Sequence, residues 1–278
     1  MMVFLNGRFV PEEQATVSVF DRSFLYGDGL FESMRVTRGK PFRWWDHMER
    51  LRKGGDFLGI RIPFACKSLE KFAAELIAKN QMPESLLRLT VSRGVGLRGY
   101  SPKGAATPSL VMTLHALPPA PAAGGGWRLH TASLRLAAGE KLAQFKTANK
   151  LAQVLARAEA EAAGADEALL LNTDGFVVEG ASSNLFWVEG DTICTPPLAS
   201  GILAGVTRAV IVELCQQLIL PVAEREITAE GLREVSGIFV TLSSLGVVEC
   251  RELDGVALAR SPLVERLCRA YDEQLLRE

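Results

Sequence analysis

Lys146 is the residue of this chain best placed for covalent chemistry on a carbonyl group. It follows Phe145 and precedes a predicted helix, and no lysine occurs after Lys150. A lysine amine forms a Schiff base near neutral pH only when an apolar or cationic setting lowers its pKa. A solvated lysine at the start of a helix is the alternative, and the position of Lys146 alone leaves both open.

Glu179 is the second residue with a chemical use. It ends an apolar, strand-like segment immediately before Gly180. An unpaired charge at a buried strand edge is costly, so this carboxylate needs a cation. The protonated ring nitrogen of pyridoxal phosphate is one, and a carboxylate there keeps the ring able to accept electrons. An ordinary ion pair with an arginine is the alternative.

Two segments have the features of a phosphate site. Gly205, Val206 and Thr207 enter a predicted helix, so backbone N–H groups and a hydroxyl would face an anion. Ser243 and Ser244 follow a predicted buried strand and would add hydroxyls. The alternatives are a plain helix cap and a polar strand terminus.

Arginines supply the remaining candidate ligands. Arg50 lies on a predicted helix, and a guanidinium suits phosphate because it is always charged and bidentate. A solvated arginine is the alternative there. The glycine-rich turn 93–102 runs into a proline instead of a helix, so it does not fit a nucleotide-binding fingerprint. We expect a mobile loop that presents Arg98 and Tyr100 to a carboxylate.

The composition favours a small-molecule partner. The chain has 278 residues, 48% of them hydrophobic, which suits two lobes that share a cleft. Its net charge is −1 and its 31 basic residues are scattered, unlike a nucleic-acid binder. No apolar run approaches the ~20 residues that cross a bilayer, so no membrane partner is expected. The five cysteines lack CxxC spacing, as reduced thiols of a cytoplasmic protein do. The three histidines lack metal-ligand spacing, so no metal is predicted.

A Pro/Ala/Gly stretch over residues 116–126 divides the chain. We predict a small N-terminal α+β domain over 1–117, a linker over 118–126 and a larger domain over 127–278. In the first domain we predict one hairpin at residues 6–7 and a second at residues 38–40, whose strands cover 31–36 and 41–44. We also predict helices over 46–58 and 67–79 and strands over 86–92 and 110–115. In the second we predict strands over 127–134, 167–171, 176–179 and 237–242, and helices over 149–162 and 206–218.

The motifs, taken in order, resemble those of the class IV pyridoxal-phosphate aminotransferases, also called fold type IV. They are residues 21–32 (DRSFLYGDGLFE), His47-x-x-Arg50-Leu51, Lys146-x-x-Asn149, residues 165–169 (ADEAL), residues 179–186 (EGASSNLF) and residues 205–208 (GVTR). The match covers nearly the whole chain. That family includes branched-chain and D-amino acid aminotransferases, (R)-selective amine transaminases and aminodeoxychorismate lyases.

The resemblance implies an α+β fold with a smaller N-terminal α/β sandwich lobe and a larger mixed β-barrel-like lobe with flanking helices. It implies that Lys146 is the Schiff-base lysine that also shuttles the α-proton, and that Glu179 is the partner of the ring nitrogen. The other implied cofactor contacts are Arg50, Ser183, Asn184, Gly205, Val206, Thr207 and Ser243. The implied substrate contacts are Phe31, Arg98, Tyr100 and Ser244. Members are typically homodimers in which loops of the partner subunit close the site.

The implied activity is transfer of an amino group from an amino acid or amine to a keto acid such as 2-oxoglutarate or pyruvate. The alternative is a 4-amino-4-deoxychorismate lyase, which releases pyruvate and gives 4-aminobenzoate. Loop 93–101 is close to the lyase pattern, and its Arg98 also matches a carboxylate-binding arginine of D-amino acid aminotransferases. Residues 31–35 and 98–101 depart from branched-chain patterns. Leu242 replaces a residue that is usually small in aminotransferases, which would narrow the substrate pocket.

Overall fold

The computed structural model describes residues 1–121 and 125–278, and the chain forms two compact units. The first contains Met1–Leu117 with Phe145–Lys150 and Glu278, and the second contains Pro118–Gln144 with Leu151–Arg277. Residues 122–124 of the predicted linker lie outside the described residues. The units differ from the predicted domains mainly in Phe145–Lys150, which joins the first unit because its backbone pairs with a strand there.

The first unit contains a six-stranded antiparallel sheet in the order β2-β1-β6-β5-β3-β4. Its strands are β1 (Met2–Leu5), β2 (Arg8–Pro11), β3 (Gly29–Thr37), β4 (Lys40–Pro41), β5 (Ser85–Ser92) and β6 (Ser109–His115). The hairpin predicted at residues 6–7 is confirmed by the pairing of β1 with β2. The second predicted hairpin forms, but its return strand ends at Pro41 and Trp44 begins a helix, which corrects the predicted strand over 41–44.

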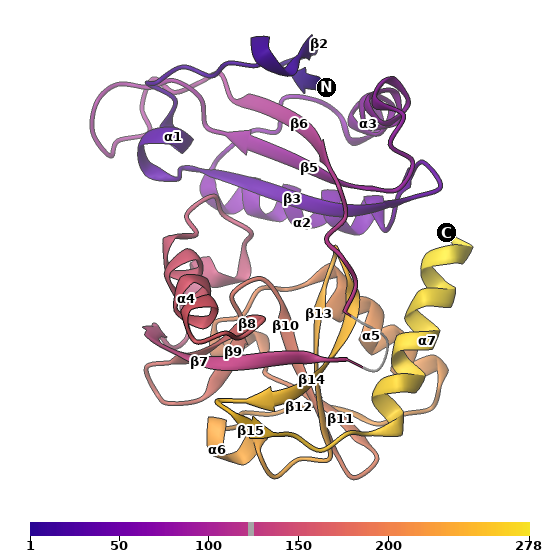
Figure 1. Cartoon of the computed structure of the whole chain (residues 1–278). Coiled ribbons are helices and arrows are strands. Elements are labelled where there is room, and N and C mark those ends of the chain that lie inside the picture. Colours follow the sequence, from indigo (N-terminus) through magenta and orange to yellow (C-terminus); the bar gives the residue numbers. More distant parts are fainter. Residues whose placement is uncertain (122–124) are drawn as a thin grey trace. The chain divides into compact units, whose positions relative to one another are not determined.

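Two helices cover one face of this sheet (Figure 1). The helices of the unit are α1 (Arg22–Tyr26), α2 (Trp44–Leu58) and α3 (Cys66–Asn80), with a 3₁₀ turn at Glu12–Gln14. Leu30 and Met34 of β3 pack with Met48 and Leu51 of α2 in a fully buried core. Because side chains alternate along a strand, Phe31 points to the face that α2 and α3 leave uncovered. The predicted α/β sandwich lobe is confirmed.

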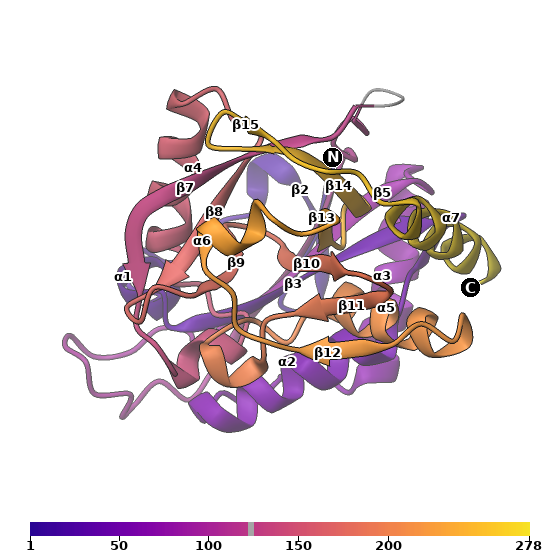
Figure 2. The same cartoon turned by 90° about the horizontal axis from the view of Figure 1, so that it is seen from below.

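The second unit is built on a closed barrel, which can be followed in Figure 2. Six strands pair in the order β10-β13-β14-β7-β8-β9, and the pairing of β9 with β10 closes the ring. The ring is mixed because β7 pairs in parallel with both β14 and β8. The strands of the unit are β7 (Trp127–Leu136), β8 (Glu167–Asn172), β9 (Val177–Gly180), β10 (Asn184–Glu189), β11 (Thr192–Thr195), β12 (Val222–Glu224), β13 (Gly237–Leu242), β14 (Gly246–Leu253) and β15 (Val256–Ala257).

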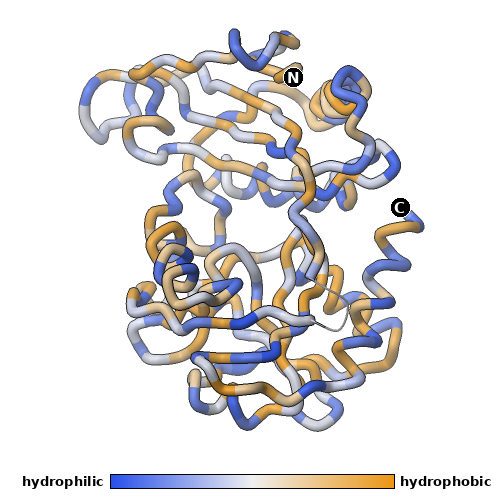
Figure 3. The backbone as a smooth tube through the Cα atoms, viewed as in Figure 1, coloured by the Kyte–Doolittle hydropathy of each residue, from blue (hydrophilic) through white to orange (hydrophobic). Residues whose placement is uncertain are grey.

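The helices of the second unit pack around the barrel wall, as predicted for flanking helices. They are α4 (Leu151–Ala162), α5 (Val206–Gln217), α6 (Ala229–Leu232) and α7 (Pro262–Arg277), with 3₁₀ turns at Lys141–Gln144 and Leu198–Ser200. Val264, Leu267 and Tyr271 form the buried stripe of α7, and Figure 3 shows apolar and polar residues alternating along it. Within the described part of the chain, no helix is both long and apolar enough to cross a membrane.

Candidate active site

The first unit holds Lys146 in place through its backbone. The N–H of Phe31 donates to the carbonyl of Lys146 at 2.9 Å, and the N–H of Ala148 donates to the carbonyl of Gly29 at 2.8 Å. The segment therefore runs antiparallel beside the start of β3. Cross-strand neighbours share a face, so the Lys146 side chain lies over Phe31, with Nζ 4.6 Å from the ring centroid.

Phe145 anchors this segment from the other side. Its side chain points to the helix-covered face, where its ring stacks on Phe57 of α2 with centroids 4.4 Å apart and packs against the core. The alternation of the segment thus places an apolar anchor on one face and the amine of Lys146 on the other.

Arg50 is fixed by a buried acid that the sequence analysis missed. Arg50 donates from Nε to Oε1 of Glu32 at 2.9 Å and from Nη2 to Oε2 at 2.6 Å. Nδ1 of His47 lies 2.7 Å from the same Oε2. Burial opposes ionisation of Glu32, but the Arg50 guanidinium and the hydrogen bonds of Arg50 and His47 lower its pKa to about 2. Burial lowers the pKa of His47, so it faces Glu32 as a neutral N–H donor.

In the second unit, Glu179 is buried and holds the turn that leads into α5. Its Oε2 accepts a hydrogen bond from the N–H of Leu203 at 2.9 Å. Asn184 donates from Nδ2 to the carbonyl of the same Leu203 at 2.9 Å. Glu179 and Asn184 therefore both hold the backbone of Leu203, one at its N–H and the other at its carbonyl. Leu203 lies two residues before Gly205, where the predicted phosphate seat begins.

The start of α5 has the geometry of an anion seat. Gly205 is its N-cap and supplies no side-chain acceptor, so the first N–H groups of the helix lack the partners that a side-chain cap would give. A Cβ on Gly205 would collide with Oδ1 of Asn184, so only glycine fits between the strand and the helix. Val206 and Thr207 are buried at the first helical positions.

Three polar side chains form a row across neighbouring strands of the barrel wall. Asn184 of β10 pairs with Glu179 of β9 on one side and with Thr241 of β13 on the other. Direct cross-strand partners share a face, so all three point to the side on which α5 begins. The hydroxyl of Thr241 is buried and has no hydrogen-bond partner among the described residues. Sequence reasoning missed Thr241, although its alternation with Ser243, just past the strand, was a usable signal.

Ser183 has a partner within the protein. Its hydroxyl donates to Oε2 of Glu167 at 3.2 Å, and the hydroxyl of Ser182 donates to the same oxygen at 2.7 Å. Glu167 is completely buried and also lies 3.6 Å from a guanidinium nitrogen of Arg157. The hydroxyls thus fix the turn between β9 and β10, which carry Glu179 and Asn184.

The uncovered face of the first sheet carries a second cation that the sequence analysis missed. The guanidinium of Arg88 lies 3.9 Å from the ring centroid of Phe31, and burial lowers the pKa of Arg88. The alternation of β5 was the available signal, because it puts Arg88 on the face opposite the core leucines. Arg98 and Tyr100 are exposed in the loop after β5, and Ser244 is half-buried after β13.

The predicted residues therefore form two sets. The first unit carries Phe31, Arg50, Arg98, Tyr100 and Lys146, and the second carries Glu179, Ser183, Asn184, Gly205, Val206, Thr207, Ser243 and Ser244. Among the described residues, no group of three His, Cys, Asp or Glu side chains is arranged to hold a metal ion. The first set contains a primary amine, and the second contains a buried carboxylate and a glycine-started helix.

Comparison with known proteins identifies the family. Residues 29–253 match the family model for amino-transferase class IV. A putative branched-chain-amino-acid aminotransferase of Methanocaldococcus jannaschii is 35% identical over 255 residues, 92% of this chain and 88% of that protein. The D-alanine aminotransferase of Bacillus licheniformis is 30% identical over 288 residues, 100% of this chain and 98% of that protein.

Solved structures agree. The branched-chain aminotransferase of Thermoproteus uzoniensis with norvaline superposes with a TM-score of 0.92 at 30% identity, covering 100% of this chain and 96% of that one. The 4-amino-4-deoxychorismate lyase of Pseudomonas aeruginosa gives 0.86 at 34% identity, covering 99% and 98%. The prediction from the motifs is confirmed: the chain belongs to the class IV aminotransferases, a family of enzymes that use pyridoxal phosphate.

Proposed function

We propose that this chain is a transaminase that moves an amino group from an amino acid or amine to a keto acid such as 2-oxoglutarate or pyruvate. The observation that carries the proposal is the placement of Lys146, whose backbone is bonded to β3 and whose amine lies over Phe31. Bound pyridoxal phosphate supplies a ring that accepts electrons when the substrate loses its α-proton.

We assign each predicted cofactor contact a separate role. Lys146 would hold the cofactor through Nζ, and the same amine is placed to take the α-proton of the substrate. The carboxylate of Glu179 would keep the ring nitrogen protonated. The N–H groups that start α5, the hydroxyls of Thr207 and Ser243, and the guanidinium of Arg50 would hold the phosphate.

The other predicted contacts act more indirectly or on the substrate. Asn184 positions the turn at Leu203, and Ser183 positions the strands through Glu167. Phe31, Arg98, Tyr100 and Ser244 are proposed to contact the substrate. Arg88, stacked on Phe31, adds a half-buried guanidinium that suits a carboxylate, which supports a keto acid as acceptor.

Aminodeoxychorismate lyase activity is the alternative. It is favoured by the loop 93–101, with its Arg98, and by the likeness to the lyase of Pseudomonas aeruginosa. In that reaction Lys146 would take the proton from the ring carbon that carries the amine, and the carbon–oxygen bond to the enolpyruvyl group would break. That group would gain a proton and leave as pyruvate, while the nitrogen would remain on 4-aminobenzoate.

The test uses Lys146→Ala beside Lys150→Ala, a lysine one turn further along the chain. The purified protein should be yellow, and only Lys146→Ala should lose the absorbance of the bound cofactor together with all turnover. Each protein is then given an amino donor with 2-oxoglutarate or pyruvate and, separately, aminodeoxychorismate. An unchanged spectrum in Lys146→Ala would refute the assignment of the lysine, and pyruvate release from aminodeoxychorismate without transamination would replace the transaminase by the lyase.

We also propose that the protein is a cytoplasmic homodimer. The cytoplasm is supported by the five cysteines, all of which are free thiols. A dimer is supported by apolar side chains that each unit exposes to solvent, among them Phe20 and Phe24 in the first unit and Leu151, Val154 and Leu155 in the second.

A further inference from the structure

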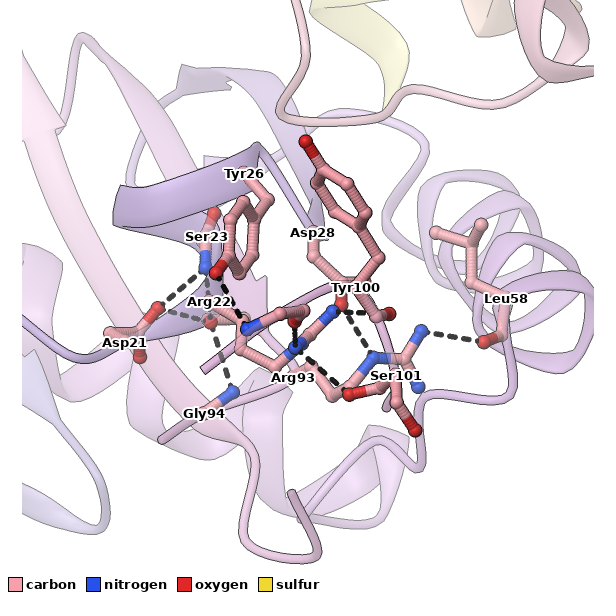
Figure 4. A network of polar contacts seen from close by, with 12 residues as sticks. Asp21, Arg22, Ser23, Tyr26, Asp28, Leu58, Arg93, Gly94, Tyr100 and Ser101 are labelled. Carbon is pink, nitrogen blue, oxygen red and sulfur yellow. Dashed lines mark hydrogen bonds and ion pairs between the residues drawn. The ribbon is translucent and has the colours of Figure 1, made fainter. Parts of the chain in front are cut away.

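The loop that carries Arg98 and Tyr100 is tied down by another arginine. The loop connects β5 to β6, and its two predicted substrate-binding side chains are exposed, Tyr100 to 87%. Arg22, at the start of α1, is itself only 4% exposed. Its guanidinium reaches three consecutive carbonyls of the loop, at 2.9 Å to Gly99, 3.1 Å to Tyr100 and 3.1 Å to Ser101 (Figure 4).

The charge of Arg22 is balanced by Asp28. Nε of Arg22 donates to Oδ2 of Asp28 at 2.8 Å, and Nε of Arg93 donates to the same oxygen at 2.7 Å (Figure 4). Arg93 also donates to the carbonyls of Leu58 and Gly59 at the end of α2. The Asp28 carboxylate thus links Arg22, which binds residues 99–101 of the loop, to Arg93, which lies at the start of the loop.

Backbone contacts fit the loop to α1 as well. The N–H of Arg22 donates to the carbonyl of Gly94 at 2.9 Å, and the N–H of Gly99 donates to the Tyr26 hydroxyl at 3.2 Å. The Tyr26 ring meets the Tyr100 ring edge to face, with centroids 5.6 Å apart. Gly99 has a φ of +105°, a conformation that L side chains rarely adopt, so its carbonyl can turn toward Arg22.

We infer that Arg22 is a positioning residue for substrate recognition. By binding the carbonyls of residues 99–101 and sharing Asp28 with Arg93, it holds the loop in the conformation that displays Arg98 and Tyr100. The inference rests on the proposed function, because it takes these two side chains to bind the carboxylate of an amino or keto acid. It gives the cluster of Arg22, Asp28 and Arg93 control over the KM through the loop, without a direct contact of Arg22 with the substrate.

The nature of these contacts allows a role of Arg22 in positioning the loop to be distinguished from a general contribution to stability. The acceptors of Arg22 in the loop are main-chain carbonyls. The bonds therefore depend on the backbone conformation of residues 99–101 and not on which side chains these residues carry. A planar guanidinium spreads its donors over three nitrogens and spans separated acceptors, whereas the three N–H donors of a lysine ammonium sit on one compact nitrogen. Arg22→Lys therefore keeps the charge opposite Asp28 and loses most of the hold on the loop.

The first experiment measures the holoenzyme of Arg22→Lys beside Arg52→Lys, a surface arginine paired with Asp56 on α2. We expect a rise of about tenfold in the KM for the keto acid, equivalent to one lost charge-assisted hydrogen bond. The kcat at saturation and the absorbance of bound cofactor should change less than twofold by the same argument. Arg52→Lys should match the wild type. A fall in kcat with an unchanged KM would overturn the inference.

The second experiment tests whether Arg22 acts through Arg98. If it does, Arg22→Lys should add almost nothing to the KM of Arg98→Ala, because the group that the loop presents is already gone. Additive effects would contradict the inference. If Arg22→Lys does not fold, Asp28→Asn, which keeps the shape of the carboxylate and removes its charge, should give the same pattern of KM and kcat.

The third measurement does not depend on activity. Hydrogen exchange of the amides of residues 97–101 should be faster in Arg22→Lys than in wild type, while the amides of β5 and β6 remain protected. Unchanged exchange in the loop would refute the positioning role. A wild-type protein without transamination would instead refute the proposed function, and the exchange result would still decide whether Arg22 holds the loop.

Discussion

Glu32 is a buried carboxylate whose ionisation should set the acid side of the stability profile. Its pKa falls from 4.5 to about 2 in the folded state, because Arg50 and His47 outweigh the burial that opposes ionisation. A carboxyl with a lowered folded pKa stabilises the protein above pH 4.5 and loses that contribution as the pH falls through about 2. The sign therefore predicts a stability that declines with acid across this window.

Glu32→Gln should flatten that decline and lower stability at neutral pH. Removing one partner of a buried ion pair costs about 3–5 kcal/mol, because Arg50 would keep a charge without its carboxylate. The free energy of unfolding, from urea titrations at pH 7 and at steps between pH 4.5 and 2, measures both effects. Glu13→Gln, at an exposed glutamate, is the control. Parallel pH profiles for Glu32→Gln and wild type would show that Glu32 is not the titrating group.

Single residues could be predicted from the sequence where type and motif order suffice. Lys146 and Glu179 stand out because an amine after an aromatic residue and an acid at the end of an apolar strand are visible as patterns. Glu32, Arg88 and Thr241 were missed because their roles depend on partners far away in the sequence. The role of Glu32 depends on its ion pair with Arg50, 18 positions further along the chain, and the role of Thr241 depends on its pairing with Asn184 on the next strand.

At the scale of elements, the junction between β10 and α5 is the tightest part of the candidate site. Gly205→Ala would drive a Cβ into Oδ1 of Asn184, although the φ and ψ of −68° and 135° suit any residue. The effect is therefore steric, and it should displace the N–H groups at the start of α5. Overpacking of this kind costs about 1–3 kcal/mol.

We expect Gly205→Ala to bind pyridoxal phosphate roughly fivefold more weakly, if about half of that cost, about 1 kcal/mol, falls on the phosphate seat. Titration of the apoprotein with the cofactor, followed by absorbance, measures the affinity. Gln216→Ala, at an exposed position near the end of the same helix, should bind like wild type. Equal affinity for Gly205→Ala and wild type would argue against α5 as the phosphate seat.

Local signals explain which elements the sequence predicts well. The Asn6-Gly7 turn and the helical spacing of α2 and α3 are encoded within a few residues, and each element formed within a few residues of its predicted bounds. Closure of the barrel is different, because it depends on the pairing of Asn184 with Glu179 and on two parallel pairings of β7. Such registers are set by non-local packing, and the barrel was therefore predicted only through the family resemblance.

On the scale of the whole molecule, the division into two units follows from two separate cores. One core lies between the first sheet and its helices, and another fills the barrel. The Pro/Ala/Gly stretch over residues 116–126 indicates where the chain first leaves one unit for the other. The return of Phe145–Lys150 to the first unit has no such signal, because it rests on two backbone hydrogen bonds to β3 and on the packing of Phe145 against Phe57, all with residues far away in the sequence.

The exposed apolar face of α4 is where the oligomeric state can be tested. Leu151, Val154 and Leu155 are 66%, 59% and 53% exposed and recur at helical spacing on one face. A soluble monomer rarely keeps such a stripe in water, whereas a dimer interface of standard size, about 1,600 Å² in total, would bury it. Sedimentation velocity of the wild type should therefore give twice the mass of one chain.

Leu155→Asp should shift that equilibrium toward the monomer, because a carboxylate buried in an apolar interface loses its hydration without gaining a partner. Val256→Asp places the same charge on an exposed apolar residue of β15, outside the stripe, and should remain dimeric. A wild-type monomer at tens of micromolar would refute the dimer, and a Leu155→Asp dimer would move the interface away from α4. If partner loops complete the site, the monomeric variant should also lose turnover while its Lys146 still binds the cofactor.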